Sequence, residues 1–255
     1  MREKVLVVGA GEVGGPLAKV LSGAYDVVVK DVEPLALENV EVMHICYPYD
    51  RDNFVSTAVE YIEMYSPVLT IVNSTIVPGV TRQIGEKSGR AVAYSPVRGK
   101  HTRMAQDLVR YVKFISSPQT EALERTRSHF LDAGMQVRSM ASPEALELAK
   151  LLETSYFGVL LGWAQEMERF TERVGADYLD VQQFMEEIDY LPRVVFQPGF
   201  IGGHCVLPNS FLLDGVGPSL FMDAMRESNG MKAREWESEG RSLDERVSPL
   251  EISSD

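Results

Sequence analysis

A short apolar run followed at once by a glycine-rich turn constrains this chain more than any other feature. Residues 4–8 read KVLVV and residues 9–15 read GAGEVGG. A run this apolar is typical of a strand buried on both faces of a parallel sheet. Gly9, Gly11 and Gly14 fit the spacing G-x-G-x-x-G, whose glycines allow a tight turn, the approach of a pyrophosphate and close packing of helix on strand. The feature predicts strand, turn and helix, with phosphates bound at the helix N-terminus.

A second strand is expected in YDVVVKD, which ends at Asp31. Asp31 follows Gly11 by about 20 residues, the place where a carboxylate binds the ribose 2′-hydroxyl of NAD. The same carboxylate would repel the 2′-phosphate of NADP. The sequence therefore predicts a dinucleotide-binding domain that prefers NAD, and the neighbouring Lys30 is the one residue that would weaken this preference. A glycine turn that binds no ligand is the alternative.

Apolar runs alternate with segments of helical spacing through the rest of the first half. This alternation is typical of a doubly wound parallel sheet of the Rossmann type, an α/β fold. Further strands are expected near residues 40–48, 67–75, 91–97 and 112–117, and helices over residues 54–65 and 122–134.

Ligands of such sheets bind at the carboxyl ends of the strands. This rule points to NST at residues 73–75 and to SPVRGKH at residues 95–101. The residues expected to bind the cofactor are Gly9, Gly11, Glu12, Val13, Gly14, Asp31, Ser74 and Thr75.

The composition indicates a folded globular chain and excludes several classes of function. Hydrophobic residues make up 45% of the 255, and no apolar run approaches the roughly 20 residues of a membrane-spanning helix. The formal net charge is -12 without a basic run, so no nucleic-acid partner is expected. We expect no secretory leader and a cytoplasmic protein. The spacing of the cysteines and histidines indicates neither a disulfide framework nor a metal site.

The second half begins with one long helix. Ser142 stands at the N-cap position, Pro143 suits the first helical position, and Gly175 ends the pattern. Between Tyr156 and Ala164 the helix is apolar on almost all sides, which requires other elements or a partner subunit around it. We expect this spine helix to link two domains and to form the core of a homodimer.

The chain is expected to form two domains and a tail. Residues 1–141 form the NAD-binding domain, and residues 142–230 form a small, mostly helical domain that contains the spine helix and a cysteine loop. Residues 231–255 form a polar C-terminal tail, and its last part, residues 237–255, has too little apolar content to form a domain and is expected to be mobile.

The cysteine loop, PGFIGGHCVLPN, holds Cys205 behind closely spaced glycines. Gly202 and Gly203 allow positive φ and the close approach of a ligand. If the thiolate of Cys205 attacked an aldehyde, bound NAD could oxidise the resulting thiohemiacetal to a thioester. On this pattern alone, a catalytic and a structural Cys205 both remain open.

Glu147, Lys150 and Thr154 are spaced so that they share one face of the spine helix. The simplest interpretation is a solvated stripe with an ordinary Glu–Lys pair. The cysteine loop makes a functional face the alternative.

These motifs resemble, in the same order, those of the nucleotide-sugar 6-dehydrogenases, the UDP-glucose and GDP-mannose dehydrogenase family. GAGEVGGPLA is similar to the family's dinucleotide turn, NSTIVPGVT to its S-T-x-x-P-G segment, ELAKLLET to its spine motif E-x-x-K-x-x-x-N, and GFIGGHCVLPN to its cysteine loop. The resemblance implies that NAD accepts two hydrides in turn. It also implies that Cys205 carries the covalent intermediate, Lys150 steadies the oxyanion, and Thr75 helps to place water.

Three positions depart from the family pattern. Thr154 stands in place of an asparagine, Asn209 in place of an acid, and Val97 in place of a glutamate. An amide cannot act as a base near neutral pH, so the hydrolytic half of the chemistry is in question. Family members also carry a third domain that binds the nucleotide. We therefore expect a small-molecule alcohol or a nucleotide-sugar-like substrate, and prefer the smaller one.

The segment SPVRG is more similar to the P-V-S-G-G loop of the related 6-phosphogluconate and β-hydroxyacid dehydrogenases. In those enzymes a spine lysine relays a proton. A second hypothesis is therefore a two-electron dehydrogenase in which Lys150 relays the proton and Arg98 binds a carboxylate. A third is an NAD-binding protein without catalysis. The expected catalytic residues are Cys205, Lys150, Thr75, Thr154 and Asn209, and the expected substrate-binding residues are Arg98, Lys150, Gly202 and Gly203.

Overall fold

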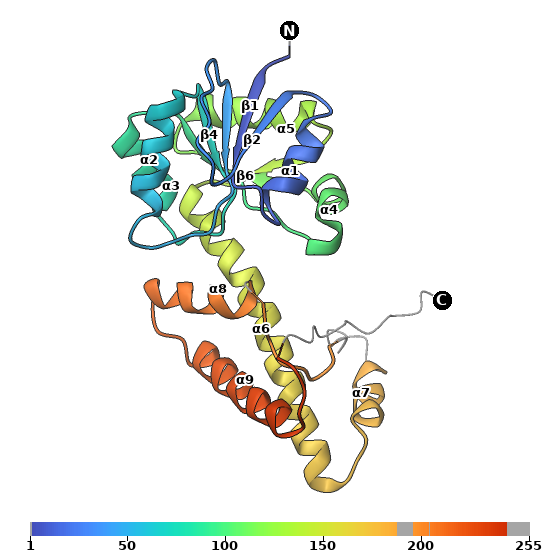
Figure 1. Ribbon diagram of the computed structural model, residues 1–255. Helices are drawn as coiled ribbons and strands as arrows, with labels where there is room; N and C mark the ends of the chain where they lie inside the picture. Colours follow the sequence, from blue (N-terminus) through green and yellow to red (C-terminus); the bar gives the residue numbers. More distant parts are fainter. Residues whose placement is uncertain (1, 188–195, 204, 244–255) are drawn as a thin grey trace. The chain divides into compact units, whose positions relative to one another are not determined.

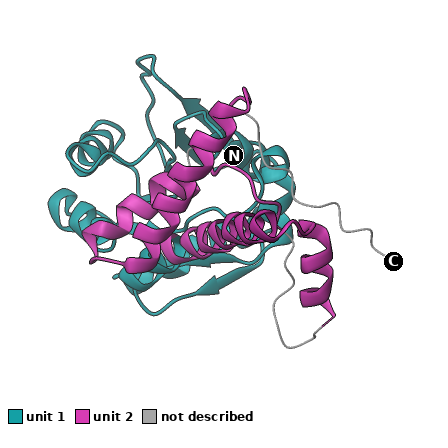
Figure 2. Ribbon diagram, turned by 90° about the horizontal axis from the view of Figure 1, so that it is seen from below, with its two compact units in different colours: residues 1–150 teal, residues 151–255 magenta. Residues whose placement is uncertain are grey.

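The computed structural model describes residues 2–187, 196–203 and 205–243. The chain forms two compact units, residues 1–150 and residues 151–255, which Figure 2 colours separately. The boundary between them falls within helix α6, Pro143–Val174. The expected fold class is confirmed, since a parallel sheet is followed by one long helix and further helical segments.

The first unit is built on a five-stranded parallel sheet with the order β2-β1-β3-β4-β5 (Figure 1). Because β2 lies on one side of β1 and β3 on the other, the strand order reverses at β1. Such a reversal opens a crevice at the carboxyl ends of the strands, where ligands of open α/β sheets bind. The strands are β1 (Lys4–Val8), β2 (Asp26–Lys30), β3 (Val42–Ile45), β4 (Leu69–Val72) and β5 (Val92–Tyr94).

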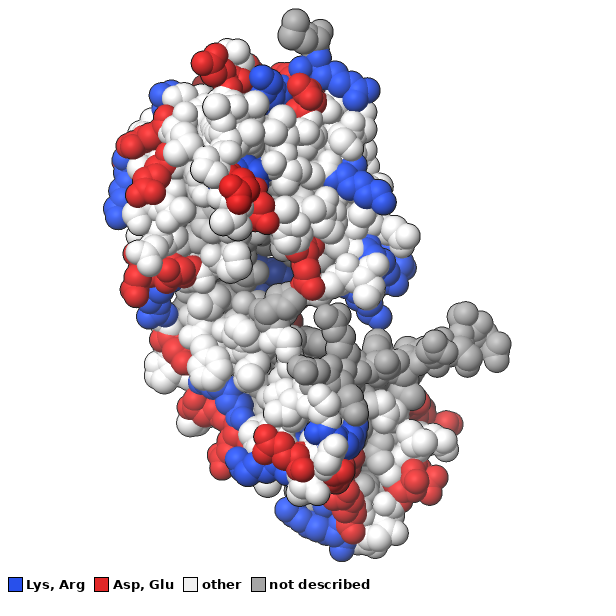
Figure 3. All heavy atoms as spheres, in the orientation of Figure 1, with Lys and Arg blue, Asp and Glu red and all other residues white. Residues whose placement is uncertain are grey.

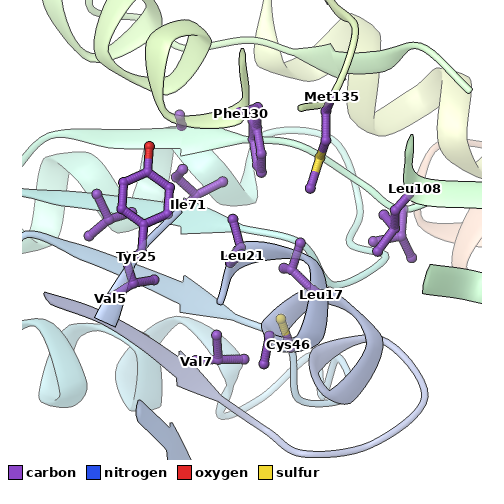
Figure 4. Packing of buried hydrophobic residues seen from close by; sticks show 14 of the residues in the cluster. Val5, Val7, Leu17, Leu21, Tyr25, Cys46, Ile71, Leu108, Phe130 and Met135 are labelled. Atoms are coloured by element: carbon purple, nitrogen blue, oxygen red, sulfur yellow. The ribbon is translucent and has the colours of Figure 1, made fainter. Parts of the chain in front are cut away.

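Helices cover both faces of this sheet, which explains why β1, β3, β4 and β5 are almost entirely buried. Val5 and Val7 of β1 belong to one buried cluster, together with side chains from α1, α4 and α5 (Figure 4). Leu6 and Val8, which point the other way, belong to a second cluster with side chains from α2 and α3. The helices are α1 (Gly14–Leu21), α2 (Phe54–Tyr65), α3 (Val80–Ser88), α4 (Met104–Arg110) and α5 (Thr120–Asp132).

A two-stranded parallel sheet completes the first unit. It pairs β6, Lys113–Ile115, with β7, Val137–Ser139. An antiparallel bridge between Tyr94 and Ser116 joins it to the end of β5. Strand β7 was not predicted, because its three residues, VRS, form too short and too polar a segment to give a strand pattern. The short 3-10 helix η1, His101–Arg103, precedes α4.

The second unit contains the rest of α6 and the helices that pack on it. Gly158 and Gly162 of α6 allow close packing: a Cβ atom on Gly158 would lie 2.9 Å from Cγ1 of Val206, and one on Gly162 would lie 3.3 Å from Cγ of Met225. These two glycines therefore explain how an apolar stretch of α6 becomes enclosed. The other elements are α7 (Tyr178–Glu186), α8 (Val206–Leu212), the 3-10 helix η2 (Leu213–Gly215) and α9 (Leu220–Ser238).

The last helix corrects the expected start of the C-terminal tail. The predicted boundary at residue 231 falls inside α9, and the helix also includes Glu237 and Ser238, the first two residues of the segment expected to be mobile. Trp236 is buried, so one large aromatic side chain holds this stretch against the protein although most of its other residues are polar. Residues 244–255 of the expected tail lie outside the described residues.

Neither a membrane-length apolar helix nor a cluster of metal ligands occurs in the described part of the chain. None of its helices combines the length and hydropathy that a membrane crossing needs. No group of three histidine, cysteine or acidic side chains gathers there as a metal site. Lys and Arg are interspersed with Asp and Glu over the face seen in Figure 3.

Two histidines form a hydrogen-bonded pair in the interior of the first unit. The Nε2 atoms of His44 and His129 lie 2.9 Å apart, and Nδ1 of His44 lies 2.8 Å from Oδ1 of Asn73. Nδ2 of Asn73 donates to the carbonyl of Ser95, so Oδ1 is the acceptor and His44 carries its hydrogen on Nδ1. His129 then donates from Nε2. In this arrangement both rings are neutral.

This pair generates a prediction for stability against pH. Burial lowers the pKa of both histidines, that of His129 from 6.5 to about 4. Between these values the unfolded chain binds a proton that the folded chain excludes, so the free energy of unfolding should fall as the pH drops from 6.5 to 4. Urea unfolding followed by circular dichroism at a series of pH values measures the slope. His129→Gln, which keeps an N–H donor toward His44, should flatten it; an unchanged slope contradicts the assignment.

Candidate functional site

The three glycines in the turn of residues 9–14 differ in whether the packing of the chain itself requires them. Gly9 has φ +98°, and a Cβ atom there would lie 2.9 Å from the backbone nitrogen of Tyr47. A Cβ atom on Gly14 would lie 1.8 Å from the carbonyl oxygen of Gly9. Around Gly11, by contrast, no heavy atom of the described residues comes within 4 Å of that position. The chain's own packing thus requires the first and third glycines, whereas the second leaves open space beside the backbone.

Helix α1 begins directly at this turn and has no side-chain cap. Val13 occupies the position before the helix, and its side chain packs against the apolar cluster of the first unit. The N-terminal N–H groups of a helix bind anions such as phosphate. A bare helix start beside an open Gly11 therefore fits the pyrophosphate of a dinucleotide.

Glu12, which the sequence analysis also expected at the cofactor, forms an ion pair with Nδ1 of His101. His101 begins η1, in the segment that follows β5. The pair links the dinucleotide turn to this segment.

Asp31 follows the last residue of β2, and its side chain is exposed. The buried Lys30 beside it donates from Nζ to the carbonyl oxygens of Asp31, at 2.8 Å, and Glu33, at 3.3 Å. The ammonium also lies 5.1 Å from the ring centroid of Tyr61. Lys30 is therefore hydrogen-bonded to the backbone of the loop that carries Asp31, and its side chain supports that loop.

Ser74 and Thr75 follow β4, where the sequence analysis placed cofactor contacts. The buried hydroxyl of Ser74 donates to the carbonyl of Tyr47 at 2.5 Å, so it ties the loop after β4 to the loop after β3. Thr75 is half-buried at the same end of the sheet. Their contacts with a cofactor remain predictions.

Glu147 is not part of a solvated stripe, and that interpretation is wrong for this residue. Its side chain is fully buried, and its carboxylate accepts hydrogen bonds from the N–H of Gly79 (2.6 Å), the N–H of Thr81 (2.9 Å) and the hydroxyl of Thr81 (2.6 Å). Helix α3 has no cap from its own Gly79, which stands at the N-cap with φ +95°. Glu147 therefore caps α3 from a distant part of the chain and fixes the first turns of α6 to it. Burial raises the pKa of Glu147, and these hydrogen bonds oppose the rise.

Lys150 lies one turn further along α6 and is half-buried. It and Arg98 are close enough to Lys113 for their charges to lower its pKa, after the larger effect of burial, to about 7. Nζ of the buried Lys113 donates to the carbonyl oxygens of Ser95, at 3.0 Å, and Pro96, at 2.9 Å. Three cationic side chains therefore share one region near the end of β5.

Lys113 was not among the residues predicted from the sequence, although a lysine at the start of the apolar strand in VKFISS was the available signal. Arg98, which was expected to bind an anion, is packed against its own unit: Nη2 donates to the carbonyl of Val112 at 2.9 Å, and the guanidinium lies 4.9 Å from the ring centroid of Phe114. Val97 is buried in the apolar cluster with residues of α4. A glutamate at position 97 would put a carboxylate among those apolar side chains.

In the second unit, Cys205 stands at the residue before α8, and its side chain is half-buried. Gly203 has φ +76°, which explains why a glycine is needed in this loop, and a Cβ atom on Gly202 would lie 3.3 Å from Cε1 of Phe200. Two of the departures from the family pattern contact each other, because Nδ2 of Asn209 donates to Oγ1 of Thr154 at 3.3 Å. An amide and a hydroxyl form this pair, and neither is a base.

The expected site residues are thus divided between the units. The dinucleotide turn, Asp31, Ser74, Thr75, Arg98 and Lys150 belong to the first unit, and Thr154, Gly202, Gly203, Cys205 and Asn209 belong to the second.

Comparisons with known proteins identify the part of the chain that carries the resemblance. Residues 144–219 match the UDP-glucose/GDP-mannose dehydrogenase family, central domain. A UDP-N-acetyl-D-mannosamine dehydrogenase of Methanocaldococcus jannaschii is 24% identical over 257 residues, covering 80% of this chain and 60% of that protein. One of Methanococcus maripaludis is 27% identical over 187 residues, covering 69% and 42%. The expected resemblance is confirmed, and the chain spans less than two thirds of the length of these curated relatives.

Solved structures share the fold. A UDP-D-ManNAc dehydrogenase of Pyrococcus horikoshii has a TM-score of 0.77 and 18% identity, over 93% of this chain and 72% of that one. A 3-hydroxyisobutyrate dehydrogenase of Mycobacterium tuberculosis has a TM-score of 0.70 and 16% identity, over 93% of this chain and 94% of that one. The Rossmann-type fold is therefore common to both classes of dehydrogenase that the motifs suggested.

The cap that Glu147 forms generates a prediction for stability. Glu147→Gln replaces one accepting oxygen by an N–H₂ group and leaves a buried N–H or hydroxyl without an acceptor, which should lower the free energy of unfolding by about 2 kcal/mol or more. Urea unfolding measures the change. Glu144→Gln is the matched control on the same helix, because it removes only the exposed ion pair with Arg82 and should cost less than about 1 kcal/mol. Equal costs for the two variants contradict the capping role.

Proposed function

We propose that this chain is an NAD-dependent oxidoreductase that acts on a CH–OH group, resembling the nucleotide-sugar 6-dehydrogenases. The observation that carries the proposal is the match of residues 144–219 to the central domain of that family, because Lys150 and Cys205 both lie in the matched segment. The named dehydrogenases among its relatives and the open glycine turn support it.

The residues of the first unit fit NAD. The open space beside Gly11 and the bare start of α1 would receive the pyrophosphate, and the exposed carboxylate of Asp31 would accept hydrogen bonds from the ribose. Because Lys30 is hydrogen-bonded to the backbone of its own loop, we expect it not to bind a 2′-phosphate, and the carboxylate of Asp31 would repel that group. When bound, NAD would supply the acceptor for a hydride.

In the proposed reaction, the substrate hydroxyl loses its proton to solvent, and Lys150 stabilises the resulting alkoxide by a hydrogen bond. Loss of a hydride from the carbon then converts the alkoxide to an aldehyde. The thiolate of Cys205 then adds to the aldehyde carbon, and the oxygen becomes an oxyanion that Lys150 stabilises. Loss of a second hydride from this thiohemiacetal gives a thioester. Water then cleaves the C–S bond, releasing a carboxylic acid and the thiol. Each oxidation removes two electrons as hydride, and the protons pass to solvent.

The last step is where this chain should differ from its relatives. Asn209 and Thr154, which are hydrogen-bonded to each other, can orient a water molecule but cannot remove its proton. Thr75, in the first unit, is the third residue proposed for placing water. We therefore expect thioester hydrolysis to be the slow step.

The substitution of Asn209 also favours a second candidate function. In a two-electron dehydrogenase of the β-hydroxyacid type no thioester forms, so no base is needed at position 209. Lys150 would then relay the proton of the substrate hydroxyl, and Arg98 would bind the carboxylate of a small substrate. Cys205 would have no covalent role.

We further propose a homodimer formed through α6. Large apolar side chains are exposed along one stripe of this helix at spacings of four and seven residues, as on a helix that packs against a partner. They are Leu152, Tyr156, Trp163, Phe170 and Val174.

The two candidate reactions differ in what Cys205→Ser does. Purified protein is assayed for NADH with UDP-N-acetyl-D-mannosamine, other nucleotide sugars and small hydroxy acids. The oxidation of the alcohol to a carboxylic acid through a thioester on Cys205 predicts two NADH per substrate. It also predicts that Cys205→Ser loses acid formation by about 100-fold or more. The β-hydroxyacid reaction predicts one NADH and near-normal activity of Cys205→Ser, while Lys150→Ala abolishes turnover. NAD binding without turnover on any substrate would contradict both and leave a binding protein.

The homodimer is tested by light scattering on the purified chain. Trp163→Glu should convert a dimer to a monomer because it places a charge in the middle of the apolar stripe. Phe184→Glu, on the exposed face of α7, is the control and should leave the dimer intact. A monomeric wild-type chain contradicts the proposal.

A further inference from the structure

The segment that leads into Cys205 has no regular secondary structure over residues 198–202. Backbone N–H and C=O groups in such a segment need partners from elsewhere when they are buried. Asn229 of α9 supplies both partners for Ile201: its Oδ1 accepts from the N–H of Ile201 at 2.7 Å, and its Nδ2 donates to the carbonyl of Ile201 at 3.1 Å. The buried carboxamide pairs with Ile201 as a neighbouring strand would.

A second buried amide fixes the first. Gln165 of α6 donates from Nε2 to the carbonyl of Gly199 at 2.7 Å and to Oδ1 of Asn229 at 3.3 Å. Its Oε1 accepts from the hydroxyl of Ser228 at 3.0 Å. Because each amide oxygen already has a donor, the orientation of both side chains is determined by the network. Gly199 and Ile201 are therefore attached to α6 and α9 at the same time.

A buried arginine anchors this network. Arg169 donates from Nη1 to the hydroxyl and from Nη2 to the carbonyl of Ser228, both at 3.0 Å. The guanidinium is ion-paired with Glu166 at 2.6 Å and with Glu235 at 2.8 Å. The charge is thus compensated on both sides, and α9 cannot shift along α6 without breaking charge-assisted hydrogen bonds.

We infer that Asn229 and Gln165 are positioning residues for the proposed cysteine chemistry: they hold residues 199–201, and through them Gly202, Gly203 and Cys205, in one conformation. The inference rests on the proposed function only for the measurement of kcat described below. Asn229 lies beyond residue 219, where the match to the family ends. On this inference the proposed site of the second unit extends to α9, which lies outside the motifs and outside the segment that the family model matches.

The test compares two substitutions that remove different parts of the amide pair. Asn229→Asp keeps an acceptor for the N–H of Ile201 and loses the donor to its carbonyl, whereas Asn229→Leu loses both. Hydrogen exchange of the full chain, read by mass spectrometry, should show the amide of Ile201 exchanging about tenfold faster in Asn229→Leu and less fast in Asn229→Asp. Gln165→Met should loosen the same segment at Gly199. Glu227→Ala, on the exposed face of α9 two residues away, is the matched control.

Two further measurements separate this inference from the proposed function. Alkylation of Cys205 by iodoacetamide as a function of pH should change in the Asn229 variants, whether or not the thiol is catalytic. With a substrate in hand, kcat should fall about tenfold in Asn229→Asp while the Kd for NAD is unchanged. If Asn229→Leu does not fold, Asn229→Asp decides alone. Unchanged exchange at residues 199–203 and an unchanged alkylation profile in a folded Asn229→Asp overturn the inference.

Discussion

The carboxylate of Glu147 is the interaction on which the arrangement of the first unit depends most. It lies on the first turns of the long helix, yet its three hydrogen-bond donors belong to the start of α3, more than sixty residues earlier in the chain. An isolated buried carboxylate is costly, so this contact can persist only if all three donors are in place. The loop after β4, which carries Thr75, and the turn of α6 that carries Lys150 are consequently set by the same carboxylate.

A comparable constraint acts near the end of β5. The buried ammonium of Lys113 holds the carbonyl oxygens of Ser95 and Pro96, directly before Arg98. Two donors satisfy both carbonyls, and a neutral amine has two N–H groups to offer. Deprotonation therefore preserves these hydrogen bonds and relieves the repulsion from Lys150 and Arg98. Loss of a proton from Lys113 would therefore lower the number of positive charges in this region by one without removing its two hydrogen bonds.

Local patterns were sufficient for much of the fold. The dinucleotide turn was predictable because its glycines have a recognisable spacing, of which Gly9 and Gly14 are required by the chain's own packing. Helix α2 was predictable because its apolar spacing is regular from Phe54 to Tyr65. The roles of Glu147 and Asn229 were not predictable in this way. Each depends on backbone groups far away in sequence, and a polar residue on an amphipathic helix has the same local pattern whether it is solvated or buried. Similarly, the helical end of α9 could not be predicted, because the segment is mostly polar and a single buried side chain, Trp236, holds it in place.

The three glycines of the first turn differ in what opposes their substitution by another residue. Substitution of Gly9 or Gly14 would be opposed by the chain itself, so selection for folding alone keeps them. At position 11 no described atom stands in the way of a side chain, and folding alone would let the residue drift. The proposed pyrophosphate site supplies a reason for a glycine at this position that folding does not. If a dinucleotide binds there, a side chain at position 11 would be opposed by the bound molecule, whereas side chains at positions 9 and 14 are opposed by the polypeptide.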